Sequence, residues 1–371
     1  MDMPRLEKQK TAHPLPQGEQ SYESLFGLFA CESYLTEFRT AVTVAPMKRF
    51  YDFPADLWSY FLEVDQRFNG PATTDVSPAA IAPRQGDLPP VKAVLWDVYG
   101  TLCSLDYGDM EKTLQWDDIL QPSARATIEE FNLGESLRRR FPDAEPGAKL
   151  VELLLEQINH SHQASRDKGI EHPEVVIERI WQHILEPCRR AGFAPCRAEP
   201  ELHTAYRVAY FFDASLQKMA LFDGMASCLW AFKEAGIVQG IISNAQFYTP
   251  IRLRRLLRLA LDQPDFELDD VFTESLVLFS HELGFSKPNP GGFRIAVKAL
   301  GERHITPAET LYIGNDMLND MTAAQQAGLG AVLFAVDDQV ILREDDPRCR
   351  DTQPDGVVHH ASQISGLILN K

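Results

Sequence analysis

VKAVLWDVYGTL, at residues 91–102, is the stretch that decides the fold of this chain. It is a short apolar run that ends in an aspartate, Asp97, and is followed by a turn at Gly100. Such a run is typical of a strand buried in a parallel sheet, with a polar residue at its carboxyl end. Ligands of open parallel sheets bind at that end. We therefore expect Asp97 to face a binding site.

The same pattern recurs four times toward the carboxyl terminus. The runs are IVQGIISNA, SLVLFS, TLYIGND and GAVLFAV, at residues 237–245, 275–280, 310–316 and 330–336. Helical patterns lie between them, for example MASCLWAFKEAG and GGFRIAVKALG. The alternation of strand and helix predicts a parallel sheet with helices on both faces. The predicted fold class is α/β with a Rossmann-like core.

Residues 104–220 show amphipathic helical stretches and no strand-like run. In EVVIERIWQHIL, residues 174–185, the apolar side chains recur at the spacing of one helix face. A helical block inserted between the first two strands of a sheet lies above their carboxyl ends. We predict that residues 104–220 form a helical cap, and that residues 91–103 and 221–371 form the core.

The residues before the core divide into two parts. Residues 1–70 carry clusters of aromatic and aliphatic residues and are predicted to be a helical N-terminal extension. So many aromatic side chains would not stay in water, so we expect the extension to pack on the core, on a second copy or on a partner. Residues 71–90, rich in proline and alanine, are predicted to be a linker.

Composition limits the functional classes. The chain has 371 residues with 44 % apolar and 24 % charged residues, which is ordinary for a globular protein. Its net charge of −17 argues against nucleic acid or an anionic membrane as the main partner. It has no long apolar run or secretory signal, and its six cysteines lack zinc-like spacing, so a cytoplasmic location is expected.

Four polar groups follow the predicted strands. They are Asp97 with Gly100 and Thr101, Ser243 with Asn244, Lys287, and Asp316 with Asp320. Together they would supply a carboxylate, hydroxyl donors, an ammonium group and an acidic pair around one point. This set suits nucleophilic attack by a carboxylate on a phosphoryl group or an alkyl carbon, with a hard cation held by oxygen ligands.

With these motifs in this order, the chain resembles the haloacid dehalogenase superfamily, with a helical cap of the C1 type inserted after the first strand. The resemblance covers roughly residues 91–371. It implies that Asp97 is the nucleophile and that Lys287 neutralises charge on Asp97 and on the transferring group. It also implies hydrogen bonds from Thr101 and Ser243 to that group, with Gly100 and Asn244 beside the substrate.

The resemblance further implies a magnesium ion held by Asp97, Asp316, Asp320 and the backbone carbonyl of Tyr99. Tyr99 is also a catalytic candidate, because it stands where phosphatases of the superfamily carry a second aspartate as general acid and base. The DVYGT sequence resembles the dehalogenase branch instead, whose leaving halide needs no proton. Asp106 and Asp109 are candidates for a replacement acid.

The acidic pair favours a phosphatase, because two carboxylates beside a nucleophile would repel each other without a cation. The predicted function is a magnesium-dependent phosphatase that acts on a small phosphorylated substrate through an aspartyl-phosphate intermediate. Two alternatives stay open. One is a metal-independent hydrolase of the 2-haloacid dehalogenase type, and the other is a catalytically weak binding or scaffold protein.

Overall fold

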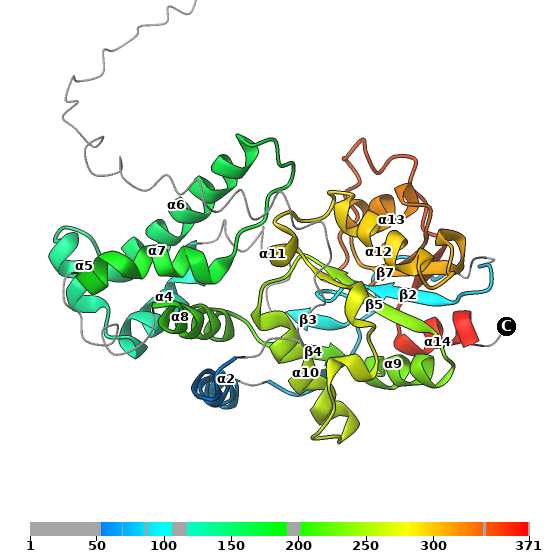
Figure 1. Cartoon of the computed structure of the whole chain (residues 1–371), viewed down its shortest axis with the longest axis horizontal. Helices are drawn as coiled ribbons and strands as arrows, with labels where there is room; N and C mark the ends of the chain where they lie inside the picture. The colour runs from blue at the N-terminus through cyan, green and yellow to red at the C-terminus, as the bar shows by residue number, and fades with distance from the viewer. Residues whose placement is uncertain are drawn as a thin grey trace, which may run out of the picture. The chain divides into compact units, whose positions relative to one another are not determined.

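The structure is a computed structural model that describes residues 53–68, 70–84, 86, 88–105, 117–190, 201–336 and 339–369 (Figure 1). Most of the predicted N-terminal extension, residues 1–52, lies outside the described residues. The loop with Asp106 and Asp109 lies outside them as well.

The core contains one sheet of six parallel strands in the order β6-β5-β2-β7-β8-β9. The strands are β2 (Ala93–Trp96), β5 (Val238–Ser243), β6 (Val277–Phe279), β7 (Thr310–Gly314), β8 (Gly330–Phe334) and β9 (Gly356–Val358). The α/β prediction is confirmed. In the sheet register, Trp96 lies opposite Ile241 and Ile313. The strands β2, β5 and β7 therefore end side by side, and the residues that follow them meet at one edge.

Helices cover both faces of this sheet (Figure 1). Along β2, Val94 and Trp96 belong to one buried apolar cluster, whereas Ala93 and Leu95 belong to another. The first cluster includes residues of α9 (Met225–Glu234), α10 (Tyr248–Leu261) and α14 (Ala361–Leu369). The second includes residues of α12 (Gly291–Gly301) and α13 (Ala323–Gln326). Successive strand residues point to opposite faces, so each strand of the sheet contributes to both clusters.

The helical insert is framed by two short antiparallel strands, β3 (Cys103–Leu105) and β4 (Met219–Phe222). Its helices are α4 (Asp117–Glu130), α5 (Gly134–Arg140), α6 (Pro146–Arg166), α7 (Ile177–Arg190) and α8 (Glu201–Leu216). The described part of the insert is helical, as predicted. The ends of the predicted range 104–220 differ slightly, because residues at both ends belong to the strand pair.

The helix α2 (Ala55–Phe68), within the predicted extension, is part of the same hydrophobic cluster as the insert. The rings of Phe61 on α2 and Tyr210 on α8 stack with centroids 4.4 Å apart. The cluster also includes Phe247 and Ile251 of the core, so it joins α2, insert and core. In the predicted linker, β1 (Thr73–Thr74) pairs with β4. That stretch is thus attached to the strand pair rather than spanning freely between two parts.

Candidate active site

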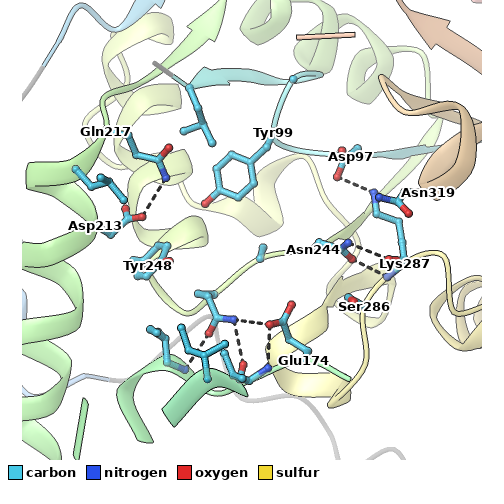
Figure 2. A pocket seen from close by; sticks show the side chains of 18 of the residues that line it. Asp97, Tyr99, Glu174, Asp213, Gln217, Asn244, Tyr248, Ser286, Lys287 and Asn319 are labelled. Atoms are coloured by element: carbon cyan, nitrogen blue, oxygen red, sulfur yellow. Dashed lines mark hydrogen bonds and ion pairs between the residues drawn. The ribbon is translucent and has the colours of Figure 1, made fainter. Parts of the chain in front are cut away.

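Asp97 and Lys287 form an ion pair at the carboxyl end of β2. The Asp97 amide donates to the Ile313 carbonyl at 2.9 Å, which extends the strand pairing by one residue. The Lys287 ammonium lies 2.9 Å from Asp97 Oδ1 and 2.5 Å from Asp320 Oδ1. The Lys287 side chain is only 5 % exposed. Figure 2 shows Asp97 and Lys287 facing each other at the side of a cavity.

The charge on Lys287 is stabilised by its two carboxylate partners. Burial alone lowers the pKa of an ammonium group, but Asp320 and Asp97 outweigh this effect and raise the pKa of Lys287 above its ordinary value. The ammonium also donates to the hydroxyl of Tyr312 at 2.9 Å. Lys287 is therefore a buried cation at neutral pH, beside the predicted nucleophile.

Asn244 holds the backbone of Lys287 in place. Its Oδ1 accepts from the Lys287 amide at 2.7 Å, and its Nδ2 donates to the Lys287 carbonyl at 3.2 Å. Asn244 lines the cavity. Its amide group, however, is used to join the turn after β5 to the segment that carries Lys287.

The predicted hydroxyl donors, Thr101 and Ser243, are both buried and have no hydrogen-bond partner within the described structure. Ser243 lines a small second cavity together with Asn244 and Lys287. A buried hydroxyl without a partner is unfavourable unless a ligand supplies one. Ser243 thus has free hydrogen-bonding capacity beside Asn244 and Lys287, but it does not line the larger cavity that contains Asp97. Thr101 is not part of either cavity wall.

Gly100 makes the turn after Asp97 with φ of +74°. A Cβ atom at this position would overlap the side chain of Asn315, and the positive φ disfavours any residue that has a side chain. The side-chain amide of Asn315 donates to the carbonyl of Gln339 at 2.6 Å. The turn at Gly100 is therefore packed directly against a carboxamide from the segment that follows β7.

Tyr99 lines the cavity, but its hydroxyl is engaged elsewhere. It lies 2.6 Å from the Thr249 hydroxyl on α10. In Figure 2 the ring points away from Asp97 and Lys287, toward Asp213 and Tyr248. Burial raises the pKa of Tyr99 further above its ordinary value, with the Asp213 carboxylate adding to the shift. The side chain is thus a protonated phenol and a poor base at neutral pH.

Asp320 is fully buried and bonded through both oxygens. Its Oδ1 contacts Lys287 and lies 3.1 Å from the Tyr312 hydroxyl. Its Oδ2 accepts from the amides of Asn315 and Asp316, at 3.0 and 2.9 Å. Burial raises the pKa of Asp320 above its ordinary value, and Lys287 opposes this shift.

Asp316 is paired with an arginine. Arg343 donates Nε to Asp316 Oδ1 at 2.8 Å and Nη2 to Oδ2 at 2.6 Å. Asp316 also accepts from the amides of Leu318 and Asn319 as the N-cap of the π-helical turn Met317–Thr322. Nothing in the sequence motif signals this arginine, because it lies on a separate loop beyond β8.

The donor set does not fit the predicted magnesium ion. A carboxylate has about four lone-pair sites. Asp316 already accepts five N–H donors, and Asp320 accepts from Lys287 and two amides. Magnesium prefers oxygen ligands with free lone pairs. Among the described residues, no three His, Cys, Asp or Glu side chains are arranged to hold a metal ion.

A cavity of about 420 Å³ lies between the sheet edge and the insert. The predicted residues Asp97, Tyr99, Gly100, Asn244, Lys287, Asp316 and Asp320 all line it. The insert contributes an apolar wall, consisting of Leu120, Leu154, Ile158, Val175, Ile177, Trp181, Ala209, Phe212 and Leu216. The structure therefore brings the four motifs to one cavity and places the predicted cap over it.

Two carboxylates in the cavity wall come from the insert and were not singled out from the sequence. Asp213 on α8 accepts from Arg252 Nη1 at 2.6 Å. Glu174 accepts from the hydroxyl of Ser280 at 2.7 Å and from Gln246 Nε2 at 3.1 Å. Both residues bond to the core across long sequence separations, so no local pattern could have found them.

Comparison with known proteins agrees with this geometry. A family model described as haloacid dehalogenase-like hydrolase matches residues 91–328, more than half of the chain. The chain belongs to this family of hydrolases. The resemblance inferred from the motifs is confirmed.

Relatives with a described activity are distant. The chain is 27 % identical over 280 residues to a glyceraldehyde 3-phosphate phosphatase of Methanopyrus kandleri, covering 75 % of this chain and 97 % of that one. It is 27 % identical over 155 residues to a phosphoserine phosphatase of Thermus thermophilus, covering 42 % and 53 %. A solved 2-haloacid dehalogenase from Pseudomonas syringae pv. Tomato has a TM-score of 0.46 at 21 % identity, covering 76 % of this chain and 99 % of that one.

Among the described residues, no helix combines the length and the apolarity that a membrane crossing requires.

Proposed function

We propose that the protein is a phosphatase that hydrolyses a small phosphorylated substrate with Asp97 as the nucleophile. The observation that carries the proposal is the buried pair of Asp97 and Lys287, 2.9 Å apart at the end of β2 and in the wall of the cavity. A carboxylate at this edge can attack a phosphoryl group that enters from the cavity. The distant relatives described as phosphatases support the choice of a phosphorylated substrate.

In the proposed reaction, an Asp97 oxygen bonds to phosphorus while the bond from phosphorus to the leaving oxygen breaks. Water then attacks the aspartyl phosphate, which releases phosphate and restores the carboxylate. Lys287 balances the negative charge on Asp97 and on the transferring group. The unpartnered hydroxyl of Ser243 donates a hydrogen bond to a phosphoryl oxygen.

The proposal assigns no acid–base role to Tyr99. Its hydroxyl is bonded to Thr249 and directed away from Asp97, and its pKa is raised by burial. Loss of a general acid and base typically costs a factor of about 10² to 10⁴ in rate. We therefore expect esters with a stable leaving group, such as aryl phosphates, to react much faster than alkyl phosphates.

Phosphatases of this superfamily typically use magnesium. The proposed steps include no metal ion, because Asp316 and Asp320 are already bonded to the protein's own donors. Magnesium remains a prediction from the sequence, to be measured on the protein itself.

The second candidate is metal-independent hydrolysis of a carbon–halogen bond by the same Asp97. The arrangement of Tyr99 favours it, because a leaving halide needs no proton and the site offers no acid at that position. In this reaction an Asp97 oxygen displaces halide from carbon, and water hydrolyses the resulting ester.

A substrate screen distinguishes these functions. Aryl phosphates, alkyl phosphates and 2-haloacids are offered to the protein with magnesium and with excess chelator, while phosphate and halide release are measured. Phosphate release that is lost in Asp97→Asn supports the first candidate. Halide release without phosphate release replaces it with the second. Binding of a phosphate mimic without any turnover would indicate a binding or scaffold protein.

A further inference from the structure

The loop that follows β8 is joined to the segment that follows β7. The Ile341 amide donates to the Asn315 carbonyl at 2.9 Å, and the Met317 amide donates to the Ile341 carbonyl at 2.9 Å. The Gln339 carbonyl accepts from Nδ2 of Asn315. Gln339 and Ile341 both line the cavity. Gln339 and Ile341 are therefore part of the cavity wall, although loop 339–343 lies outside the four sequence motifs.

Arg343 attaches this loop to Asp316 by a two-bond contact. The two N–H···O distances of 2.8 and 2.6 Å are those of a charge-assisted, bidentate pair. Asp316 is 3 % exposed, so its charge is removed from water. Burying a carboxylate is costly unless it is paired and hydrogen-bonded, and a guanidinium group supplies such a pair with the matching planar geometry.

We propose that Arg343 is the built-in counter-charge of Asp316 and takes the place of a divalent cation in this chain. Asp316 then serves as the anchor for loop 339–343 and not as a metal ligand. Arg343 is a positioning residue, because it acts on the cavity wall through Asp316 and through the loop that carries Gln339 and Ile341. The proposal applies to either candidate reaction, since the binding of a cation is measured without substrate.

The test is a titration of the full-length protein with magnesium chloride, followed by calorimetry and by thermal unfolding. We expect no saturable binding to wild type and no rise in its melting temperature. Arg343→Gln frees the oxygens of Asp316 while keeping hydrogen-bonding capacity. This variant should bind magnesium saturably, with an affinity at least about tenfold above the upper limit that the same titration sets for wild type. Adding Asp316→Asn to it should abolish the gain.

Arg348→Gln is the matched control, because it removes the same charge from the same region of the chain. Arg348 is 54 % exposed and pairs with Asp346 at 2.7 Å on the surface. It should leave the magnesium response unchanged.

Two results would overturn the proposal. One is saturable magnesium binding to wild type that Asp316→Asn removes. The other is a folded Arg343→Gln variant that binds magnesium no better than wild type. If Arg343→Gln does not fold, the comparison of wild type with Asp316→Asn decides. Magnesium responses that are equally weak in wild type and in Asp316→Asn support the proposal. Magnesium binding that is present in wild type and lost in Asp316→Asn contradicts it.

Discussion

At the scale of single residues, the site depends on a few buried charged side chains that pair with one another. The ammonium group of Lys287 pairs with two carboxylates, those of Asp97 and Asp320. Removing the ammonium would leave two uncompensated buried charges, which is strongly destabilising. The proposed role of Asp97 as the nucleophile is therefore best tested with a substitution at Asp97 itself that keeps its shape.

Asp97→Asn should lower phosphate release, or halide release, by at least about 10³-fold, the scale of losses seen when a nucleophile is removed. An amide has the same shape but cannot attack. Steady-state kinetics give the rate, and circular dichroism and the melting temperature verify the fold. Asp223→Asn, at an exposed position after β4, is the control and should retain full activity. Turnover near the wild-type rate in Asp97→Asn would rule out the proposed mechanism.

Tyr99→Phe should reduce kcat/KM by less than about tenfold, because an acid–base residue would cost about 10² to 10⁴. The phenol is bonded to Thr249 and faces away from Asp97, the proposed nucleophile. The lost hydrogen bond should lower the free energy of unfolding by about 1 kcal/mol. Thr249→Val breaks the same bond, so the double variant should show less than the sum of the two losses. A large drop in kcat in the Tyr99→Phe variant would instead indicate that the Tyr99 hydroxyl transfers a proton.

At the scale of elements, α2 connects the insert with the core. Asp65 on this helix is 4 % exposed and accepts from the Tyr210 hydroxyl of α8 at 2.9 Å. It also lies 3.7 Å from Arg255 of α10. One carboxylate therefore bonds to the insert and to a core helix at the same time.

Asp65→Ala should destabilise the protein by about 3 kcal/mol, because it leaves a buried hydroxyl and a partly buried guanidinium group without their partner. Denaturant unfolding measures the change. Asp56→Ala, on the same helix, is the control. Asp56 is 51 % exposed and pairs with Arg207 at 3.1 Å, so its loss should cost no more than about 1 kcal/mol. Equal effects of the two substitutions would show that α2 is a peripheral helix.

The short helix α11 (Ser280–Leu283) supports the turn after β5. The ring nitrogen Nδ1 of His281 lies 2.8 Å from the carbonyl oxygen of Ala245, and Ser280 Oγ accepts from the Ala245 amide at 2.9 Å. Burial lowers the pKa of His281 from 6.5 to about 4. The folded protein therefore keeps this imidazole neutral in a range where the unfolded chain takes up a proton.

The free energy of unfolding should decrease as the pH falls from about 6.5 to about 4, with His281 contributing about 3 kcal/mol to the loss. Above pH 6.5 both states are neutral at this residue and its contribution is constant. Urea unfolding at a series of pH values measures the profile. His281→Gln should flatten it, whereas His160→Gln, at an exposed helical position, should not. A profile that is equally steep in His281→Gln would assign the pH dependence to other groups.

At the scale of the whole molecule, hydrogen bonds between the insert and the core oppose an opening of the predicted cap. The Glu174 amide donates to the Gly284 carbonyl at 3.2 Å, and the Ser286 amide donates to the His172 carbonyl at 2.8 Å. Asn289 Nδ2 donates to the Glu171 carbonyl at 3.0 Å. These bonds join the insert to the core beside the cavity, whose wall includes Glu174 and Ser286.

Hydrogen exchange should therefore show slow exchange of the Glu174 and Ser286 amides without any ligand. Addition of beryllofluoride, a phosphate mimic, should increase protection mainly around Asp97. A mobile lid would give a different exchange pattern, because residues 104–220 would become protected only when the site is filled. Fast exchange at Glu174 that slows with the mimic would favour the lid.

The sequence by itself determined the order and the class of the parts. Each apolar run with a polar residue at its end forms a parallel strand. The reason is that strands of a parallel sheet are buried on both faces, which requires a continuous apolar run. The meeting of Asp97, Asn244, Lys287 and Asp320 at one edge follows from that topology. The helical insert was visible from its periodicity and from its place after the first strand.

Only the tertiary structure decided which groups in the site are already bonded. Tyr99 pairs with a residue 150 positions away, and Asp316 pairs with one 27 positions away. The motif spacing contains no information on Thr249 or Arg343, because both contacts arise when α10 and the loop after β8 pack beside the strands. A carboxylate in a motif looks the same in sequence whether a metal or a guanidinium group satisfies it. The difference lies in which buried donors reach its lone pairs, and folding alone brings them there.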